Sequence, residues 1–226
     1  MGATMRCFIM MLVCGLSMAA FVNADEGGWT SLFDGKTLTG WKSYSGRPIG
    51  SQWVVEDGAI HLTAGGGGDI VTEKEFRDFE FRFQWKVAPG ANSGVMYRVQ
   101  PGDKAPYFSG PEYQVLDDAR HRDGGNPKTS AAALYGLIAG AEKELKPVGE
   151  WNSGKIVVKD NHIEHWLNGR KVVETDIGTD AWKDMIAGSK FKDWKQFATA
   201  PQGMICLQDH GDKVWFRDLQ IRELTP

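Results

Sequence analysis

The sequence predicts an all-β protein that folds as a sandwich of two antiparallel sheets with a short helical insertion. Phe79 to Val87 alternates apolar and polar residues, which is the period of a strand with one buried face. Asp57-Gly58 and Asn168-Gly169 each separate two short apolar runs, and such dipeptides favour tight hairpin turns. The clearest helical spacing lies between Ala181 and Phe197, where Gly188 divides it into two short pieces.

Two further stretches of strand character complete the expected sheets. After the turn at Pro89 to Gly94, Val95 to Val99 is expected to return as a strand antiparallel to Phe79–Val87. The last strand, Lys213 to Leu224, changes its apolar register near Asp218, which predicts a β-bulge.

The first 24 residues have the pattern of a secretory signal peptide. Arg6 is the only charge, an apolar run covers Phe8 to Val13, and Val22 and Ala24 place small residues at positions −3 and −1. The apolar run is shorter than the roughly 20 residues that span a bilayer, which argues against an uncleaved anchor. Residues 1–24 are therefore predicted to be removed, leaving a secreted or periplasmic chain without a transmembrane segment.

Composition limits the classes of function. The chain has 226 residues and a formal net charge of −3, and removal of Arg6 makes it more negative, so nothing attracts nucleic acid. Cys7 and Cys14 leave with the leader, and Cys206 alone can form no disulfide framework and no cysteine-based metal site. Residues 25–226 suffice for a single domain. The oligomeric state is not predicted.

One strand-like stretch, Ser109 to Asp118, carries polar side chains where a buried strand would carry aliphatic ones. Because side chains alternate along a strand, Glu112 and Gln114 share one face. Tyr113 and Asp117 take the other. A Glu and a Gln on one face predict the floor of a polar cleft, and an ordinary solvated sheet face is the alternative.

Other polar residues lie where strands are expected to end. His210 occupies the turn Asp209-His210-Gly211, which suits either a solvated rim or a general base. His121 opens a long polar loop, and loops of that length are often functional. Arg98 lies within a predicted strand, where a buried guanidinium needs a carboxylate partner.

Two further histidines have a spacing that does not suit metal binding. His162 and His165 are three residues apart, so they lie on opposite faces of a strand and cannot chelate one metal together. Both are interpreted as structural, although Trp166 and Asn168 beside His165 also suit a surface that faces sugar. His165 therefore stays among the substrate-binding candidates.

Six motifs carry a resemblance to a known family. They are LFDGKTLTGW from Leu32, WVVEDGAI from Trp53, FEFRFQWKV with NSGVMYR, GPEYQVLDD, HWLNGRKV and GMICLQDHGDKVWFRDLQI. In this order they resemble the secreted 3-keto-disaccharide hydrolases, also described as 3-keto-glucoside lyase/hydratase domains. The resemblance implies that residues 25–226 form a catalytic domain with a concanavalin A-like jelly roll and bind an oxidised sugar on the concave sheet.

The activity implied by the resemblance is cleavage of glycosides whose C3 hydroxyl has been oxidised to a ketone. The ketone acidifies the C2 proton, a base removes it, the C1 oxygen leaves with the help of an acid, and water adds to the enone. The catalytic candidates are Glu112, His210, Arg98, Asp117 and His121. The substrate-binding candidates are Gln114, Asn92, Tyr135, Lys128, Gln208 and His165.

Some of these roles stay open. Arg98, Lys128 and Tyr135 can each face the oxyanion, and the base and acid are not assigned among the carboxylates and histidines. A divalent metal held by these groups is a further expectation, although the sequence contains no spaced ligand signature.

Two other classes of function remain as alternatives. A conventional glycoside hydrolase would need Glu112 and Asp117 to face each other across a sugar, and their opposite strand parity argues against it. A carbohydrate-binding module without catalysis would need exposed aromatic rings but no convergent set of acid, histidine and arginine. The polar candidates for catalysis and substrate binding favour an enzyme.

The leader gives the first testable prediction. Exported protein is expected to begin at Asp25, because Val22 and Ala24 are the small residues that signal peptidase requires. Mass spectrometry of exported material measures this N-terminus directly. An intact Met1 or a lipidated Cys14 would contradict the prediction.

Overall fold

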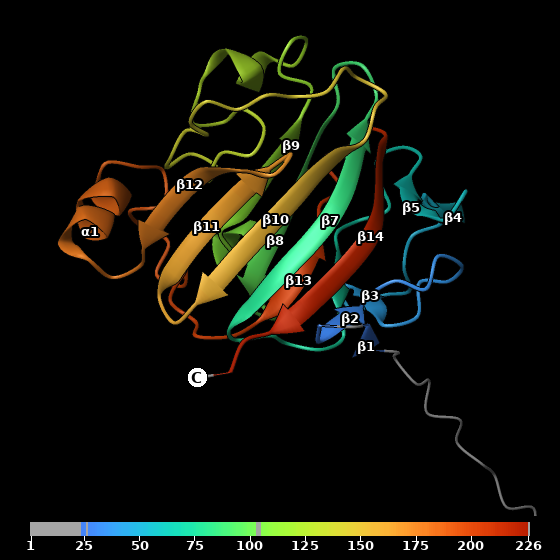
Figure 1. Cartoon of the computed structure of the whole chain (residues 1–226), viewed down its shortest axis with the longest axis horizontal. Coiled ribbons are helices and arrows are strands. Elements are labelled where there is room, and N and C mark those ends of the chain that lie inside the picture. The colour runs from blue at the N-terminus through green and yellow to red at the C-terminus, as the bar shows by residue number, and fades with distance from the viewer. Residues whose placement is uncertain (1–23, 26, 103–104, 226) are drawn as a thin grey trace, which may run out of the picture.

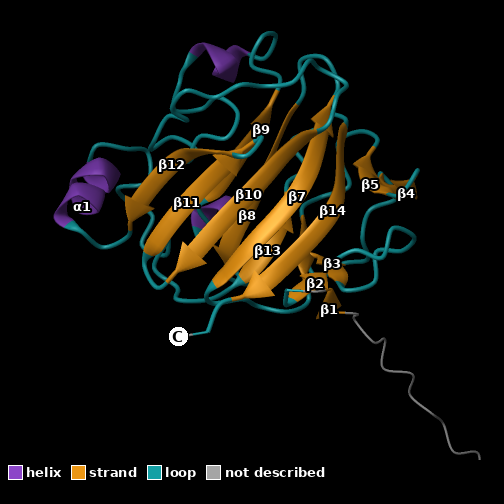
Figure 2. Ribbon diagram, viewed as in Figure 1, coloured by secondary structure: helices purple, strands orange, loops and turns teal. Residues whose placement is uncertain are grey.

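The computed structural model describes residues 24–25, 27–102 and 105–225. The predicted leader, residues 1–24, lies outside the described residues except at its last position, and its cleavage stays a prediction. In the described part, strands joined by turns dominate, with one α-helix, α1 (Asp180–Ala187) (Figures 1 and 2). The all-β prediction is confirmed. No helix of these residues is long and apolar enough to span a membrane.

A nine-stranded antiparallel sheet forms one layer of the sandwich. Its main path runs β1-β2-β14-β7-β10-β11-β12, with the β4–β5 hairpin attached through β5 to β14. The strands are β1 (Ala24–Asp25), β2 (Trp29–Ser31), β4 (Trp53–Glu56), β5 (Ala59–Leu62), β7 (Phe79–Val87), β10 (Asn152–Lys159), β11 (His162–Leu167), β12 (Arg170–Asp176) and β14 (Val214–Glu223). This sheet faces the viewer in Figure 1.

A five-stranded antiparallel sheet lies behind it in the order β3-β6-β13-β8-β9. The strands are β3 (Trp41–Ser43), β6 (Ile70–Thr72), β8 (Asn92–Val99), β9 (Glu112–Leu116) and β13 (Met204–Leu207). Two short 3-10 helices flank β9, namely η1 (Pro106–Phe108) and η2 (Arg122–Gly125). The two layers confirm the predicted sandwich.

The core lies between the sheets and follows the alternation read from the sequence. On β7, Phe79, Phe81, Phe83 and Trp85 are buried while the residues between them are half-buried. The facing sheet contributes side chains such as Tyr113, whose ring meets Phe83 edge-on at 5.3 Å. Aromatic pairs of this geometry add to the free energy gained by burying their area.

Two local predictions are confirmed by backbone geometry. Asp57 and Gly58 both have positive φ, 50° and 72°, as the tight turn between β4 and β5 requires. In β14 the pairing with β7 shifts between Arg217 and Gln220, and Asp218 there has φ 53°. A bulge thus joins the two apolar registers of the last strand.

The predicted pairing of Phe79–Val87 with Val95–Val99 is wrong. β7 pairs with β10 and β14, whereas β8 pairs with β9 and β13 in the opposite sheet. Asp117 Oδ2 accepts a hydrogen bond from Gly90 N and Asp212 Oδ2 accepts one from Asn92 N, which fixes the connection as a crossover between layers. Both strands bury an apolar face, and facing sheets bring those faces together.

The helical insertion is shorter than its sequence pattern. Thr179 caps α1 by accepting a hydrogen bond from Trp182 N, and Gly188 ends the helix. The chain after Gly188 forms turns in place of a second helical piece. Phe191, Trp194 and Phe197 nevertheless pack together there, with Phe191 stacked on Phe197 at 4.0 Å.

His165 lies in the core, so its assignment as a substrate-binding residue is wrong. The side chain is fully buried, with Nδ1 donating to Ala132 O at 3.2 Å and Nε2 accepting from Tyr97 Oη at 3.0 Å. Burial lowers the pKa of the imidazole to about 4, and the bonds to Ala132 O and a neighbouring backbone group oppose this only in part. The ring is a neutral bridge between the sheets.

The neutral state of His165 predicts a loss of stability in acid. Its pKa is lowered on folding, so its contribution is complete above the unfolded pKa of about 6.5 and is lost as the pH falls towards 4. Urea unfolding at pH 7 and pH 4.5 is expected to differ by about 2–3 kcal/mol from this group. In His165→Gln that part of the difference should disappear, and an unchanged pH dependence would refute the assignment.

Candidate active site

A small pocket of about 230 Å³ opens on the face of the five-stranded sheet that points away from the core. Strands β8 and β9, the segment after β13 and the segment after α1 supply its walls. The lining residues are Asn92, Tyr107, Gly110, Glu112, Gln114, Tyr135, Lys190, Phe191, Phe197, Gln208 and His210. Many of the predicted site residues therefore converge on one place.

The Glu112 carboxyl lies across β8, over a residue without a side chain. Glu112 pairs with Met96, and its carboxyl extends beside Gly94, where a Cβ atom would lie 2.0 Å from Glu112 Oε1. No side chain other than hydrogen fits at position 94 while the carboxyl keeps this place. Strand β8 begins at Asn92, within the stretch predicted as a turn, so Gly94 is a strand residue that provides the space for this carboxyl.

Burial changes the chemistry of Glu112. Loss of solvent raises the pKa of its carboxyl to about 8; the positive charge of Lys190 opposes the rise, and Asp69 and Asp123 add to it. A carboxyl group with this pKa titrates near neutral pH, where a general acid or base is most effective.

Three amide side chains in the pocket have oxygens that lack a partner within the described residues. They are Asn92 Oδ1, Gln114 Oε1 and Gln208 Oε1, and each side chain is more than nine-tenths buried. Gln114 is held in place because its Nε2 donates to Thr129 O at 2.9 Å. Buried acceptors without donors are costly, so these oxygens are suited to a ligand with hydroxyl groups.

His210 lines the pocket, and His121, a second predicted catalytic residue, lies beside it without lining the pocket. His210 is exposed, and its ring lies edge-on to His121 with 6.2 Å between centroids. Asn92 Nδ2 lies 3.4 Å from His210 Nε2. His121 Nδ1 accepts from Asp123 N, which leaves Nε2 to carry the proton in the neutral ring.

A glycine-rich loop supports the turn that carries His210. Asp209 Oδ2 accepts hydrogen bonds from Gly66 N and Gly68 N, and Asp209 Oδ1 accepts one from Gly211 N. Gly65 and Gly211 are in backbone contact, since a Cβ atom on Gly65 would lie 2.8 Å from Gly211 Cα. The position of His210 is therefore determined by backbone packing.

Lys190 is a pocket residue that sequence reasoning missed. Its Nζ lies 4.2 Å from the centre of the Tyr135 ring and 5.2 Å from that of Phe191. Burial lowers the pKa of the Lys190 ammonium, while Glu112 and Asp123 raise it. The clustering of Lys190 and Phe191 just after Gly188 was the available signal, but spacing alone does not show which way such a segment folds.

Tyr135 completes the wall beside Lys190, as the sequence predicted for this residue. Burial raises the pKa of its hydroxyl, and the charges of Asp123 and Glu112 add to the effect. The phenol therefore stays protonated and can donate a hydrogen bond.

Two other predicted site residues, Asp117 and Lys128, lie elsewhere. Asp117 is buried and binds Gly90 N and Ala119 N, so it does not face Glu112. Lys128 is exposed and does not line the pocket.

Arg98 also lies outside the pocket. Its backbone is left-handed, with φ 54°, and the pairing of β8 with β13 shifts beside it, so the strand is irregular at this residue. Its guanidinium donates to Asp160 O at 2.5 Å and lies 3.8 Å from Asp78 Oδ1. The expected carboxylate partner is thus present, but the left-handed backbone turns the side chain away from Glu112. The prediction of Arg98 as a catalytic residue is contradicted.

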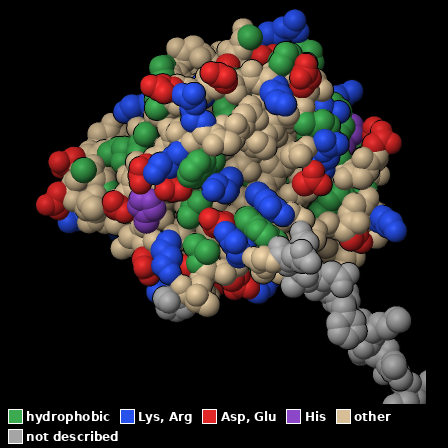
Figure 3. Space-filling view, in the orientation of Figure 1, with side chains coloured by type: hydrophobic (Ala, Val, Ile, Leu, Met, Phe, Trp, Pro, Cys, Tyr) green, Lys and Arg blue, Asp and Glu red, His purple; other side chains and the backbone are tan. Residues whose placement is uncertain are grey.

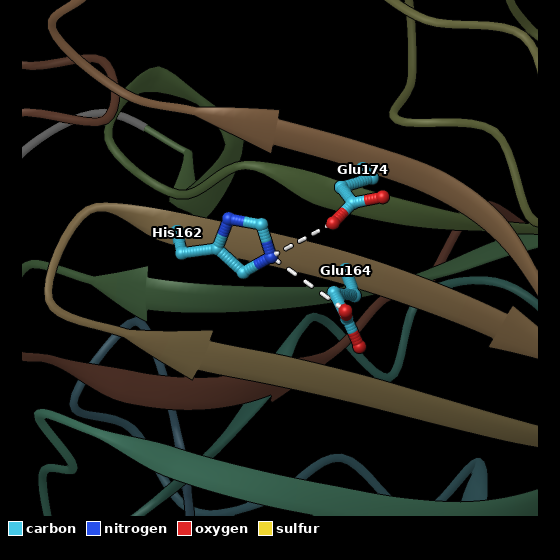
Figure 4. Close-up of side chains that lie close together, drawn as sticks. All are labelled: His162, Glu164 and Glu174. Atoms are coloured by element: carbon cyan, nitrogen blue, oxygen red, sulfur yellow. Dashed lines mark ion pairs between the residues drawn. The ribbon is translucent and has the colours of Figure 1, made fainter.

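The described residues include one cluster with the geometry of metal ligands, and it lies on the other sheet. His162, Glu164 and Glu174 project from β11 and β12 (Figure 4). Lys171 Nζ already pairs with Glu164 at 3.0 Å and with Glu174 at 2.7 Å, so the cluster is an ion-pair network. A cation in the pocket would find the Glu112 carboxyl and the amide oxygens of Gln114 and Gln208, which are hard ligands.

Fold and pocket together define a class of protein, an antiparallel β-sandwich with a buried, acid-containing pocket on one sheet. A family model described as a 3-keto-alpha-glucoside-1,2-lyase-like domain matches residues 28–222. The chain belongs to this family. A protein of Bacteroides thetaiotaomicron named 3-keto-disaccharide hydrolase is 36% identical, over 88% of this chain and 80% of its own length.

Solved structures agree with the fold. A candidate glycosyl hydrolase of Parabacteroides distasonis is 37% identical with a TM-score of 0.82, covering 88% of this chain and 94% of that one. A second one from the same organism is 32% identical with a TM-score of 0.69, covering 87% and 99%. The concanavalin A-like jelly-roll prediction is thereby confirmed.

The contact between Glu112 and Gly94 gives a prediction about the pocket. In Gly94→Ala the new methyl group displaces the carboxyl towards solvent, so the pKa of Glu112 is expected to fall from about 8 towards its ordinary value. Carbon-13 NMR titration of the glutamate carboxyls measures this. Gly125→Ala is the matched control, because a Cβ atom there meets nothing within 4 Å. An unchanged pKa in Gly94→Ala would show that the carboxyl does not depend on this space.

Proposed function

We propose that the protein is a carbohydrate-active enzyme that cleaves 3-keto-glycosides by C2 proton abstraction, elimination and hydration. The observation that carries this proposal is the buried Glu112 carboxyl, with its pKa near 8, in one pocket with Lys190 and three amide oxygens that have no partner among the described residues. The family and its relative named 3-keto-disaccharide hydrolase support the class of substrate.

The orientation of the substrate in this proposal follows from how deeply Glu112 and His210 lie in the pocket. Glu112 is buried and His210 is exposed at the rim. The leaving group must depart through the open side, so the glycosidic oxygen lies near His210 and the ketone lies deeper. Glu112 is then the base that removes the C2 proton, and His210 is the acid that protonates the departing oxygen.

Lys190 supplies the charge that this chemistry needs. Proton removal from C2 places negative charge on the C3 oxygen, and an ammonium in a desolvated pocket stabilises an enolate more strongly than water does. Asn92, Gln114 and Gln208 accept hydrogen bonds from the remaining hydroxyls. Tyr107, Phe191 and Phe197 give aromatic surface for the apolar face of the ring.

The proposal has a place in a reaction sequence. Its substrate carries a ketone at C3, so an oxidoreductase acting on a sugar hydroxyl must come before it. The predicted leader places the enzyme among secreted or periplasmic proteins, and this localisation is part of the proposal. Any divalent metal would add a Lewis acid at the same oxygens, held by Glu112, Gln114 and Gln208.

The two alternatives have less support. A two-carboxylate hydrolase built on Glu112 and Asp117 is disfavoured, because Asp117 binds backbone amides away from the pocket. A binding module needs no carboxyl with a raised pKa, since that feature costs stability and is typical of catalytic sites.

Substitution of the proposed base and acid tests the function. Glu112→Gln and His210→Ala are each expected to reduce turnover of a 3-keto-glycoside by at least about a hundredfold, with little change in melting temperature. Glu73→Gln and His162→Ala are matched controls, since both residues lie outside the pocket. In the wild-type protein kcat/KM should rise with pH up to about 8, because the Glu112 base acts only when ionised.

Incorporation of solvent deuterium at C2 of the product distinguishes elimination and hydration from direct hydrolysis. Elimination followed by hydration exchanges the C2 proton, whereas direct hydrolysis keeps it. A product without deuterium at C2 would contradict the elimination route. A kcat/KM that decreases as the pH rises through 8 would assign Glu112 as the acid instead of the base. Full activity in Glu112→Gln would leave the pocket as a binding surface only.

A further inference from the structure

The outward face of the nine-stranded sheet carries a second feature that the proposed chemistry does not use. Among the segments that the structure describes, none crosses the middle of this face in Figure 1. Figure 3 shows the same face, where Lys and Arg side chains are interspersed with hydrophobic and acidic ones. The face belongs to the sheet opposite the pocket, so it is separate from the candidate active site.

A hollow of about 410 Å³ lies on this face, within the range of about 300–1,000 Å³ that small-molecule sites occupy. It is lined by Gln84, Lys146, Trp151, Ser153, Asn168 and Arg217. Two of these residues are cations and none is an acid. In a chain with a negative net charge, this composition gives a local positive potential.

Arg217 is held rigidly in the hollow. Its Nε and Nη2 donate to Gln84 Oε1 at 2.9 and 2.8 Å, and its guanidinium lies 4.1 Å from the centre of the Trp151 ring. These bonds use one edge of the guanidinium. The edge formed by Nη1 and the second Nη2 hydrogen has no acceptor in the described part of the chain, and it is the fork that binds carboxylates in a bidentate manner.

A second cation, Lys86, lies beside the same ring. Lys86 Nζ lies 5.0 Å from the centre of Trp151 and 4.5 Å from that of Trp215. Within residues 27–102 and 105–225, neither Lys86 nor Lys146 forms an ion pair, and the nearest acid to Arg217 is Asp218, 3.8 Å from Nε. Like charges gathered beside one indole repel each other, and a bound anion relieves that repulsion.

We infer that this hollow is a second carbohydrate-binding site, which takes a sugar unit bearing a carboxylate, that is, a hexuronate within a polysaccharide. The open edge of Arg217 binds the carboxylate, and Lys146 and Lys86 add charge attraction. Trp151 and the Ser153 hydroxyl offer the aromatic wall and hydrogen bonding that a sugar ring uses. The middle of this sheet face is crossed by no described segment, which leaves room for an extended chain on either side of the bound unit.

This inference does not depend on the proposed catalysis, and binding alone tests it. Affinity electrophoresis with polygalacturonate, and calorimetry with trigalacturonate, are expected to show binding that weakens as salt increases. Lys146→Ala and Trp151→Ala should each weaken it at least about tenfold. Lys42→Ala, an exposed lysine on the five-stranded sheet, is the matched control. Lys146 is exposed and forms no ion pair with any described residue, so that variant is expected to fold normally.

Each other outcome overturns the inference. Equal retardation by neutral dextran would show that charge is not recognised. Equal binding of polyglutamate or of a sulfated dextran would show a general polyanion surface without selection for a uronate. An equal effect of Lys42→Ala would assign the binding to overall charge, and an absence of binding to polygalacturonate would remove the site.

Discussion

The burial of one carboxyl group against one glycine is the constraint on which the candidate active site depends. A carboxyl loses much of its hydration in that position, and the raised pKa of Glu112 reflects this cost. The surrounding elements supply what makes the position tolerable. Gly94 provides the space, Lys190 provides a positive charge, and the pleat of β9 keeps Tyr113 and Val115 in the core directly beside it. Pocket-lining and core side chains thus alternate along a single strand.

Period-two patterning explains why much of this could be predicted from the sequence. The alternation in β7 and the Asp57-Gly58 turn determine local structure, and both were read correctly. Glu112 and Gln114 are two residues apart, so the alternation of side chains correctly predicted that both lie on the same face of β9, which lines the pocket. These predictions needed only neighbouring residues.

The errors arose where distant segments or unusual backbone angles decide the outcome. Alternation in β7 and β8 gives each strand a buried face, but it does not say whether the strands share a sheet or face each other. Arg98 departs from its expected direction because its backbone is left-handed, which nothing in its side chain predicts. His165 satisfies both ring nitrogens inside the core through Tyr97 and Ala132, partners far away in the sequence. Lys190 reaches the pocket because the segment after α1 folds back over the sheet.

The loop of four glycines has a consequence for how this protein can change. Gly65 and Gly211 touch through their backbones, and the turn that carries His210 rests on that contact and on the Asp209 carboxylate. Side chains added to Gly65 would meet the backbone of Gly211, which cannot rotate away as a flexible side chain does. The position of His210 therefore depends on the glycine loop, which is distant in the sequence and carries no functional side chain. A search for functional side chains would not detect substitutions of these glycines. Such substitutions would nevertheless displace His210 from the rim of the pocket.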